Sequence, residues 1–271
     1  MNDMTVEELI LKTSAELLAC GIESARFEAK QLVSAVTNGK FSFEEVTTEE
    51  IRHLDQMLDR RKAHEPLQYI LGEWEFYGFP FKVGSGVLIP RQDTETLIEA
   101  ALPLIKKGDK VFDLCAGSGC IGITLAKLKG ADVTLFEKSR EALEYIKQNI
   151  TLNAVNVSVS EYDVLGKPFD GKADVIVSNP PYIKTAVVNE LSAEVKHEPK
   201  MALDGGNDGL IFYRHIASAW KESLNVGGWL IFEIGFDQGD EVSEILENAG
   251  YKEVRCIKDL GQNDRVVIGR K

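Results

Sequence analysis

Residues 110–122, with the sequence KVFDLCAGSGCIG, decide the fold class of this chain. A short apolar run leads into a glycine-rich turn, after which an apolar pattern continues at Ile121, Ile123, Leu125 and Leu128. This order predicts a strand, a tight turn and the start of a helix. The glycines at 117, 119 and 122 also match the G-x-G-x-x-G pattern of dinucleotide sites, so a nicotinamide-dependent oxidoreductase is one alternative.

Two acidic residues near this turn indicate a different cofactor. Asp113 lies four residues before the first glycine, where its carboxylate would repel a pyrophosphate and attract an ammonium group. S-adenosylmethionine carries both an ammonium and a sulfonium group. Glu137 follows the next apolar strand, residues 133–136, where a carboxylate can accept hydrogen bonds from both ribose hydroxyls. Either acid alone is an ordinary solvated strand end, but the pair around a glycine turn favours S-adenosylmethionine.

A second rigid turn follows another apolar strand, residues 174–178. Its sequence is Asn179-Pro180-Pro181-Tyr182. The side-chain oxygen of Asn179 and the carbonyl of Pro180 can together accept both N–H bonds of a planar NH2 group. The two prolines have no N–H to compete for these acceptors, and Tyr182 can cover the π-face of a substrate. The alternative interpretation is a loop that only terminates a strand.

Helical and strand patterns alternate from Thr94 onward, which predicts a parallel sheet with helices on both faces. Later strands are expected at 229–234 and 265–269, separated by a helix over 238–249 and by residues 254–257. Ligands bind at the carboxyl ends of the strands in such sheets. Because the glycine turn, Glu137 and Asn179 all follow strands, we expect them to share one site.

The first part of the chain is expected to be helical. Thr5 with Glu8, and Thr47 with Glu50, match the capping-box pattern at helix starts. Apolar residues follow each box and are expected to form a core; they are Leu9, Ile10, Leu17 and Leu18 after the first, and Ile51, Leu54 and Leu58 after the second. Pro66 disrupts further helix. Residues 73–86 are rich in aromatics and glycine and predict a β-hairpin.

These motifs together resemble class I S-adenosylmethionine-dependent methyltransferases that modify amino or amide nitrogen. Further segments narrow the likeness to the peptide-chain release factor glutamine N5-methyltransferases; they are residues 66–72, 87–95, 198–199 with 202–203, and 264–266. The likeness extends over nearly the whole chain. It implies a seven-stranded, mostly parallel Rossmann-like sheet whose final strand is antiparallel, with a small N-terminal helical domain and a linking β-hairpin.

The resemblance also implies domain limits and residue roles. The expected parts are a helical substrate-recognition domain at 1–65, a linker with the hairpin at 66–92 and a methyltransferase domain at 93–271. Catalytic roles are implied for Asn179, Pro180, Pro181 and Tyr182. Cofactor contacts are implied for Asp113, Ala116, Gly117, Gly119, Glu137, Asp163 and Asn179. Many relatives have an aromatic residue after the acid at position 163, whereas this chain has Val164. The resemblance places the loop at Arg91, Asp93, Thr94 and Glu95 beside the cofactor pocket, where we expect it to order the site; the alternative is that it only caps the next helix. Glu198 with Pro199 is expected to shape the substrate cleft.

The resemblance implies a protein substrate. The expected partner is a class 1 translation release factor, whose Gly-Gly-Gln tip presents a glutamine to S-adenosylmethionine, which becomes S-adenosylhomocysteine. We expect the helical domain to bind the body of the release factor. The mechanism expected is in-line transfer of the methyl group to the side-chain nitrogen, with the protein acting mainly by positioning.

Composition sets further limits on function. The chain has 271 residues and 44% apolar content, typical of a globular protein near the size at which a second domain forms. The formal charge of −12 argues against tight binding of nucleic acid through phosphate contacts. Four cysteines without a C-x-x-C pair, and four scattered histidines, indicate neither zinc nor a disulfide framework. We expect the cysteines to be packing residues, no metal, no membrane span and a cytoplasmic monomer.

Three alternative functions remain at this point. An amino-methyltransferase acting on an adenine or guanine base of DNA or RNA would use the same turn for a flipped base. A nicotinamide-dependent oxidoreductase is disfavoured by Asp113. A non-enzymatic nucleotide sensor or scaffold would show no methyl transfer.

Overall fold

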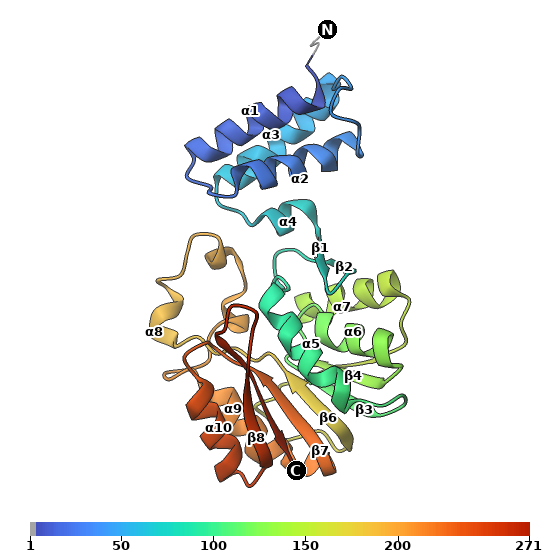
Figure 1. The fold of residues 1–271 in the computed structure, drawn as a ribbon, viewed down its shortest axis with the longest axis vertical. Helices are drawn as coiled ribbons and strands as arrows, with labels where there is room; N and C mark the ends of the chain where they lie inside the picture. Colours follow the sequence, from blue (N-terminus) through green and yellow to red (C-terminus); the bar gives the residue numbers. More distant parts are fainter. Residues whose placement is uncertain (1–3) are drawn as a thin grey trace. The chain divides into compact units, whose positions relative to one another are not determined.

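A computed structural model describes residues 4–271 of the chain, which form two compact units (Figure 1). One unit is helical and comprises the residues up to Gly72 together with residues 192–197. The other comprises residues 73–191 and 198–271 and contains the large sheet. The domain boundaries that the sequence analysis places after residues 65 and 92 stay predictions.

The helical unit is built from helices, and the first and third of them begin where the sequence predicts; the fourth follows Pro66, where no further helix was expected. Their bounds are α1 (Val6–Ala19), α2 (Ala25–Thr37), α3 (Thr48–Lys62) and α4 (Leu67–Leu71). At α1 the Thr5 hydroxyl accepts from the backbone N–H of Glu8 at 3.3 Å, and the Glu8 carboxylate accepts from the Thr5 N–H at 2.8 Å. Thr47 and Glu50 make the same reciprocal pair at α3. Both predicted capping boxes are confirmed.

The core of this unit is mainly apolar and also contains the buried ion pair of Arg61 and Glu28. Leu9, Ile10 and Leu17 of α1 are buried, but Leu18 is 64% exposed, so its assignment to the core was wrong. Leu18 is one residue, about 100°, away from the face that carries Leu17. Arg61 of α3 is buried and forms ion pairs with Glu28 at 2.5 Å and with Glu194 at 2.5 Å. The second pair joins residues 192–197 to the helical unit.

The predicted β-hairpin is present. Strands β1 (Glu73–Phe76) and β2 (Phe79–Lys82) pair antiparallel, with Trp74 opposite Phe81. The two-residue turn between them, Tyr77-Gly78, has positive φ at both positions, 51° and 75°, as the type I′ hairpin turn requires. The Glu95 carboxylate accepts from the Tyr77 backbone N–H at 2.9 Å and holds the turn.

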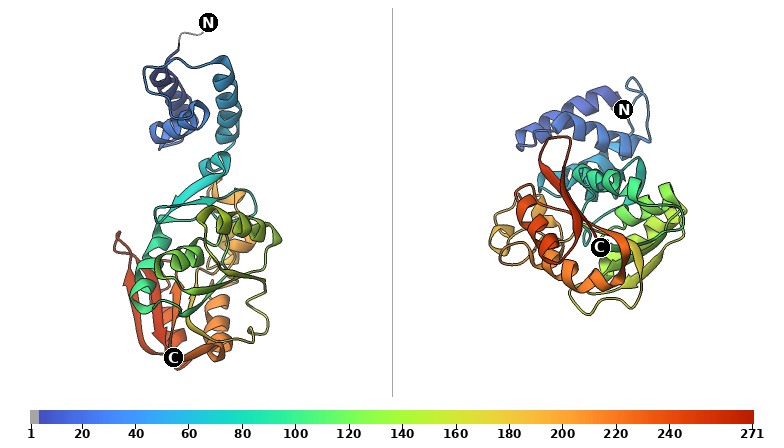
Figure 2. Two further views of the ribbon diagram at one scale, coloured as in Figure 1. Left: turned by 90° about the vertical axis from the view of Figure 1, so that its right-hand side faces the viewer. Right: turned by 60° about the horizontal axis from the view of Figure 1, so that its bottom comes forward.

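Among residues 4–271, the large sheet has seven strands in the order β5-β4-β3-β6-β7-β9-β8 (Figures 1 and 2). The bounds are β3 (Lys110–Leu114), β4 (Asp132–Glu137), β5 (Ser158–Glu161), β6 (Ala173–Ser178), β7 (Leu224–Glu233), β8 (Lys252–Lys258) and β9 (Asp264–Arg270). Strands β5, β4, β3, β6 and β7 are parallel to their neighbours, and β9 is antiparallel to both β7 and β8. The predicted fold class, with its antiparallel final strand, is confirmed.

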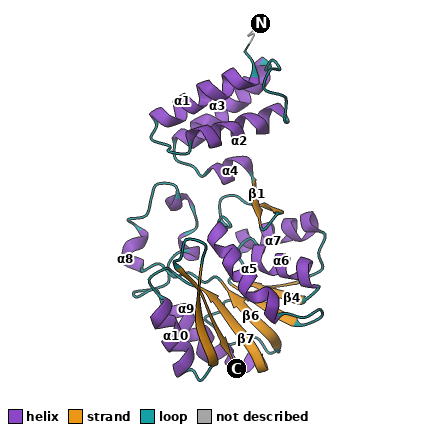
Figure 3. Cartoon of the chain, viewed as in Figure 1, coloured by secondary structure: helices purple, strands orange, loops and turns teal. Residues whose placement is uncertain are grey.

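Helices cover both faces of this sheet (Figure 3). The bounds of these helices are α5 (Glu95–Ala101), α6 (Cys120–Lys129), α7 (Arg140–Asn153), α9 (Ile211–Ala219) and α10 (Gly239–Asn248); the short α8 (Thr185–Val188) lies in the loop between β6 and α9. Because side chains alternate along a strand, Val111 and Val177 face the core under α5, α6 and α7, whereas Phe112 and Ile176 face the core under α9 and α10. The sheet is therefore buried on both sides, as its apolar strands predict.

The expectation that the cysteines are packing residues was wrong for two of the four. Cys20 and Cys256 are exposed and are not packing residues, whereas Cys120 is buried.

Within residues 4–271, no helix combines the length and the apolar character needed to cross a bilayer.

Candidate active site

Three parallel strands end side by side at one edge of the sheet. Leu114 of β3 is in register with Phe136 of β4 and with Ser178 of β6, so the residues that follow these positions share one edge. A cavity of about 140 Å³ opens there. Its walls include the predicted site residues Ala116, Gly117, Glu137, Asp163, Asn179 and Pro181. The other predicted residues, Asp113, Gly119, Pro180 and Tyr182, do not line this cavity.

The glycine turn connects β3 to α6 as predicted. Cys115, Gly117 and Gly119 all have positive φ, at 62°, 56° and 80°, and α6 begins at Cys120. An added Cβ at Gly117 would meet nothing within 4 Å, because this glycine faces open space. An added Cβ at Gly122 would lie 2.2 Å from Leu135, so the third glycine of the motif permits close packing of helix on strand.

Asp113 lies beneath the turn instead of on the wall of the cavity. Its side chain is fully buried, and Oδ2 accepts from the backbone N–H of Gly122 at 2.8 Å. Among the described residues Oδ1 has no hydrogen-bond partner. Burial raises the pKa of Asp113 to about 7. This hydrogen bond ties the end of β3 to the first turn of α6, and contact of Asp113 with the cofactor stays a prediction.

Glu137 lines the cavity at the end of β4. Its Oε2 accepts from the Gly117 N–H at 2.8 Å, and its Oε1 accepts from the Ser139 N–H at 2.7 Å. Burial raises the pKa of Glu137, and these backbone hydrogen bonds lower it. Each carboxylate oxygen has a second lone pair for a ligand hydroxyl. Glu137 therefore holds the glycine turn by a hydrogen bond and can still accept hydrogen bonds from a ligand in the cavity.

Asn179 follows β6 directly and is half-buried on the wall of the same cavity. Its Nδ2 donates to the hydroxyl of Thr94 at 3.4 Å. Pro180 and Pro181 are buried. Tyr182 is partly buried against the core under α9 and α10, and burial raises its pKa to about 12.

The Asn-Pro-Pro-Tyr turn is held by residues that the sequence patterns did not identify. Gln238 donates from Nε2 to the carbonyl oxygen of Tyr182 at 3.2 Å. Gly205 and Gly209 pack against the turn, since a Cβ at Gly205 would lie 2.6 Å from the Tyr182 Cα and one at Gly209 would lie 2.4 Å from the Tyr182 oxygen. These glycines leave room for the backbone of the turn.

Comparison with known proteins identifies the family. A Methyltransferase small domain model matches residues 91–217, and a PrmC N-terminal domain model matches residues 8–72. A release factor glutamine methyltransferase of Geobacter sulfurreducens is 40% identical over 274 residues, covering 98% of this chain and 96% of that protein. The chain belongs to the release factor glutamine methyltransferase family.

Solved structures agree with the fold of this family member. A methyltransferase of Pyrococcus furiosus superposes with a TM-score of 0.54 and 19% identity, covering 83% of this chain and 99% of its own. The 16S rRNA N2 G1207 methyltransferase of T. thermophilus, solved with AdoMet and guanosine, gives 0.53 and 20%, covering 73% and 49%. At these identities the likeness shows the fold alone.

In this release factor glutamine methyltransferase family member, the predicted ordering loop forms part of the cavity wall. Arg91 pairs with the buried carboxylate of Glu198, whose Oε2 also accepts from the backbone N–H of Ile89 at 3.2 Å. Burial raises the pKa of Glu198, and Arg91 lowers it. Arg91 and Ile89 line the cavity together with Pro199. The segments at 87–95 and 198–203 are thus joined beside the glycine turn.

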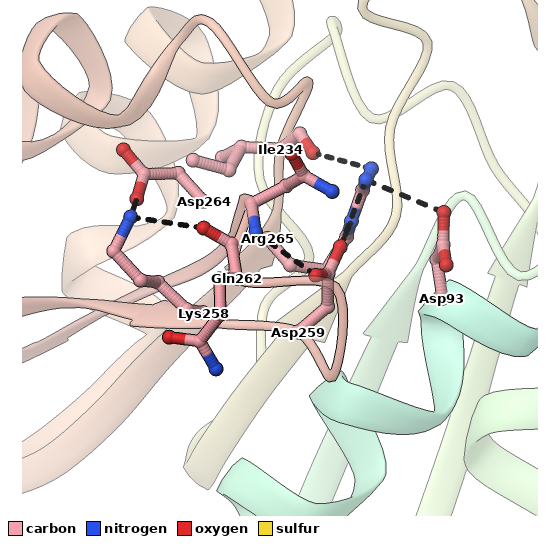
Figure 4. A network of polar contacts seen from close by, with 8 residues as sticks. Asp93, Ile234, Lys258, Asp259, Gln262, Asp264 and Arg265 are labelled. Carbon is pink, nitrogen blue, oxygen red and sulfur yellow. Dashed lines mark hydrogen bonds and ion pairs between the residues drawn. The ribbon is translucent and has the colours of Figure 1, made fainter.

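Asp93 of the same loop takes part in a different network, centred on Arg265 (Figure 4). The Arg265 guanidinium lies 3.3 Å from the Asp93 carboxylate and 3.2 Å from that of Asp259, and it donates to the Ile234 carbonyl at 3.3 Å. This network ties the start of α5 to the end of β7 and to β9. Thr94 makes no side-chain cap for α5, so the capping alternative for this loop was wrong.

The part of the cavity wall that we expect beside an adenine has an aliphatic side chain at position 164 and aromatic side chains at two other positions. Val164 is buried, and Asp163 is paired with Lys138 at 2.7 Å, which lowers the pKa of Asp163. Tyr162 and Phe212 line the same cavity. These two side chains supply the aromatic surface that Val164 does not provide, and the sequence analysis did not predict them.

Proposed function

We propose that this chain methylates the N5 nitrogen of the glutamine in the Gly-Gly-Gln motif of class 1 translation release factors, using S-adenosylmethionine. One observation carries the proposal: Asn179, which can accept from a planar NH2 group, lines the same cavity as Glu137 and the glycine turn. The residues proposed to bind the cofactor and those proposed to bind the carboxamide therefore share one cavity. Membership of the release factor glutamine methyltransferase family supports this substrate class.

The residues present fit S-adenosylmethionine. Glu137 offers carboxylate lone pairs for ribose hydroxyls, and the turn at Ala116 and Gly117 lets backbone approach a ligand closely. Val164, Tyr162 and Phe212 give apolar and aromatic surface for an adenine, and Asp163 lines the same cavity. When bound, S-adenosylmethionine supplies an electrophilic methyl group. We propose that Asp163 accepts a hydrogen bond from the adenine amino group.

The protein acts on the glutamine by orientation. An amide nitrogen is a poor nucleophile because its lone pair is delocalised into the carbonyl. The Oδ1 of Asn179 and the carbonyl of Pro180 accept its two N–H bonds, which raises electron density on nitrogen and fixes its direction. Such positioning can lower a barrier by roughly 7–11 kcal/mol. The new C–N bond would form as the methyl C–S bond breaks, S-adenosylhomocysteine would be the leaving group, and the nitrogen would lose one proton to water.

The remaining expectations concern the setting of the reaction. We propose that the helical unit binds the body of the release factor, and that the enzyme works as a cytoplasmic monomer without stable nucleic-acid binding. The charge of −12 supports the last point.

The test of this function uses Asn179→Ala. We expect the variant to lose nearly all turnover on release factor while its dissociation constant for S-adenosylmethionine, measured by calorimetry, stays within about twofold. Mass spectrometry of the Gly-Gly-Gln peptide should place one methyl group on the glutamine only with the wild-type enzyme. Methylation of DNA or RNA in place of release factor, or loss of cofactor binding by the variant, would contradict the proposal.

A further inference from the structure

A buried carboxylate lies next to Asn179 at the end of the neighbouring strand. Ser178 of β6 is in register with Phe232 of β7, so the next residues along these parallel strands are Asn179 and Glu233. Val177 and Ile231, two residues earlier, both face the core under α5. Because side chains alternate along a strand, Asn179 and Glu233 point to that same face.

Thr94, just before α5, completes the group. Its side chain is buried, and its hydroxyl accepts from Asn179 Nδ2 at 3.4 Å. The side chains of both Thr94 and Asn179 lie close enough to the Glu233 carboxyl group to lower its pKa. Glu233 itself is 1% exposed, and among the described residues its Oε2 has no hydrogen-bond partner.

The number of hydrogens that each group can donate decides which group is the donor in each of these contacts. An ionised carboxylate only accepts, and a threonine hydroxyl has one hydrogen to donate. If Thr94 donates to Glu233, its oxygen can accept one hydrogen of the Asn179 NH2 group, and Glu233 accepts the other. Both hydrogens of the side-chain amide are then used on the protein side, and Oδ1 is left for the cavity.

We propose that Glu233 and Thr94 are positioning residues that fix the amide of Asn179 in one of its two flip states, with Oδ1 toward the substrate. The flipped amide would present an NH2 group to the substrate NH2 and an oxygen to the carboxylate, so it is disfavoured twice. This inference rests on the proposed function, because only a substrate that donates two N–H bonds requires Oδ1 to face it.

Protonation of Glu233 should weaken this selection. A protonated carboxyl group has an O–H that can donate to Oδ1 of a flipped Asn179. Burial raises the pKa of Glu233 to about 7, and hydrogen bonds and Arg265 lower it. The charged and titratable groups that act on Glu233 or are acted on by it are Arg265, Asp93, Tyr182, Tyr213 and Cys120. The enzyme should therefore lose activity as pH falls through about 7.

The test compares Glu233→Gln and Thr94→Val with a matched control. Thr124→Val removes a hydroxyl that is equally buried but has no hydrogen-bond partner among the described residues. At saturating cofactor, we expect kcat/KM for release factor to fall at least tenfold in the first two variants, a loss typical of a hydrogen bond to a charged group. Thr94→Ser should restore most of it, and Thr124→Val should match wild type. The acidic decline near pH 7 should be absent in Glu233→Gln.

A second readout does not depend on catalysis. In ¹H–¹⁵N spectra of the unliganded protein, the side-chain NH2 signals of Asn179, assigned with Asn179→Ala, should shift in Glu233→Gln and Thr94→Val but not in Thr124→Val. Unmoved signals, or full turnover with an unchanged pH profile in Glu233→Gln, would overturn the inference. If wild type methylates no release factor, the proposed function fails, while these spectra still decide how the amide is held.

Discussion

Replacing Gly209 by alanine should displace the turn that carries Asn179 without removing any group that takes part in the reaction. Gly209 has a φ of +77°, and an added Cβ would lie 2.4 Å from the carbonyl oxygen of Tyr182. Ordinary van der Waals contact begins near 3.4 Å, so the overlap is about 1 Å. The neighbour in this contact is backbone, which cannot turn aside as a flexible side chain can.

Two effects of different size follow from this geometry. Positive φ costs an alanine roughly 1–2 kcal/mol of stability wherever it occurs. Relief of the overlap requires the backbone at Tyr182 to move by up to about 1 Å, which also displaces Pro180 and Asn179. A misplacement of about 1 Å at a site that works by orientation can reduce the rate by about a hundredfold. Cofactor affinity should change little, because the glycine turn belongs to β3 and α6.

The assay pairs Gly209→Ala with Gly108→Ala. Gly108 has a φ of +82°, but an added Cβ there meets nothing within 4 Å, so this variant carries the backbone strain alone. Denaturant unfolding should show a loss of stability in both, and methylation of release factor should show the hundredfold loss of kcat only in Gly209→Ala. If a folded Gly209→Ala kept kcat within about threefold of Gly108→Ala, the reasoning about the turn would be refuted.

Two further predictions concern the cofactor side. Burial raises the folded-state pKa of Asp113 from 3.8 to about 7, so between these values the folded chain keeps a proton that the unfolded chain loses, and stability falls as pH rises. Asp113→Asn should remove this fall. In denaturant unfolding, the variant should be more stable than wild type by up to about 4 kcal/mol at pH 8 and by much less at pH 5. Equal effects at both pH values would contradict the raised pKa of Asp113. Glu137→Gln should weaken binding of S-adenosylmethionine by about 1.5–3 kcal/mol in calorimetry, because one charged acceptor for the ribose is lost; an unchanged dissociation constant would remove Glu137 from the site.

Local sequence signals predicted much of this molecule because their physical causes are local. The capping box at Thr5 and Glu8 depends on residues three apart, and the hairpin around Tyr77 and Gly78 on the backbone of two turn residues. The position of Asn179 after an apolar strand placed it at the carboxyl edge of the sheet, because all parallel strands end there. These features need no knowledge of distant contacts.

Contacts between distant segments set the limit of prediction. The spacing of Asp113 from the glycines showed that it ends a strand, but not that its side chain points below the turn toward Gly122. Glu233 and Gln238 lie more than fifty residues from the turn they support, and no motif marks them. Leu18 fits an apolar run, but only packing decides which side of α1 is buried.

The central claim is that paired acceptors hold the carboxamide of the substrate. A crystal structure of the enzyme with a Gly-Gly-Gln peptide and S-adenosylhomocysteine measures this most directly. We predict that the glutamine nitrogen lies about 2.7–3.2 Å from both Asn179 Oδ1 and the Pro180 carbonyl oxygen, and points into the cavity beside Glu137. A glutamine nitrogen bound elsewhere, or an Asn179 that presents its own NH2 group to the substrate, would contradict the account.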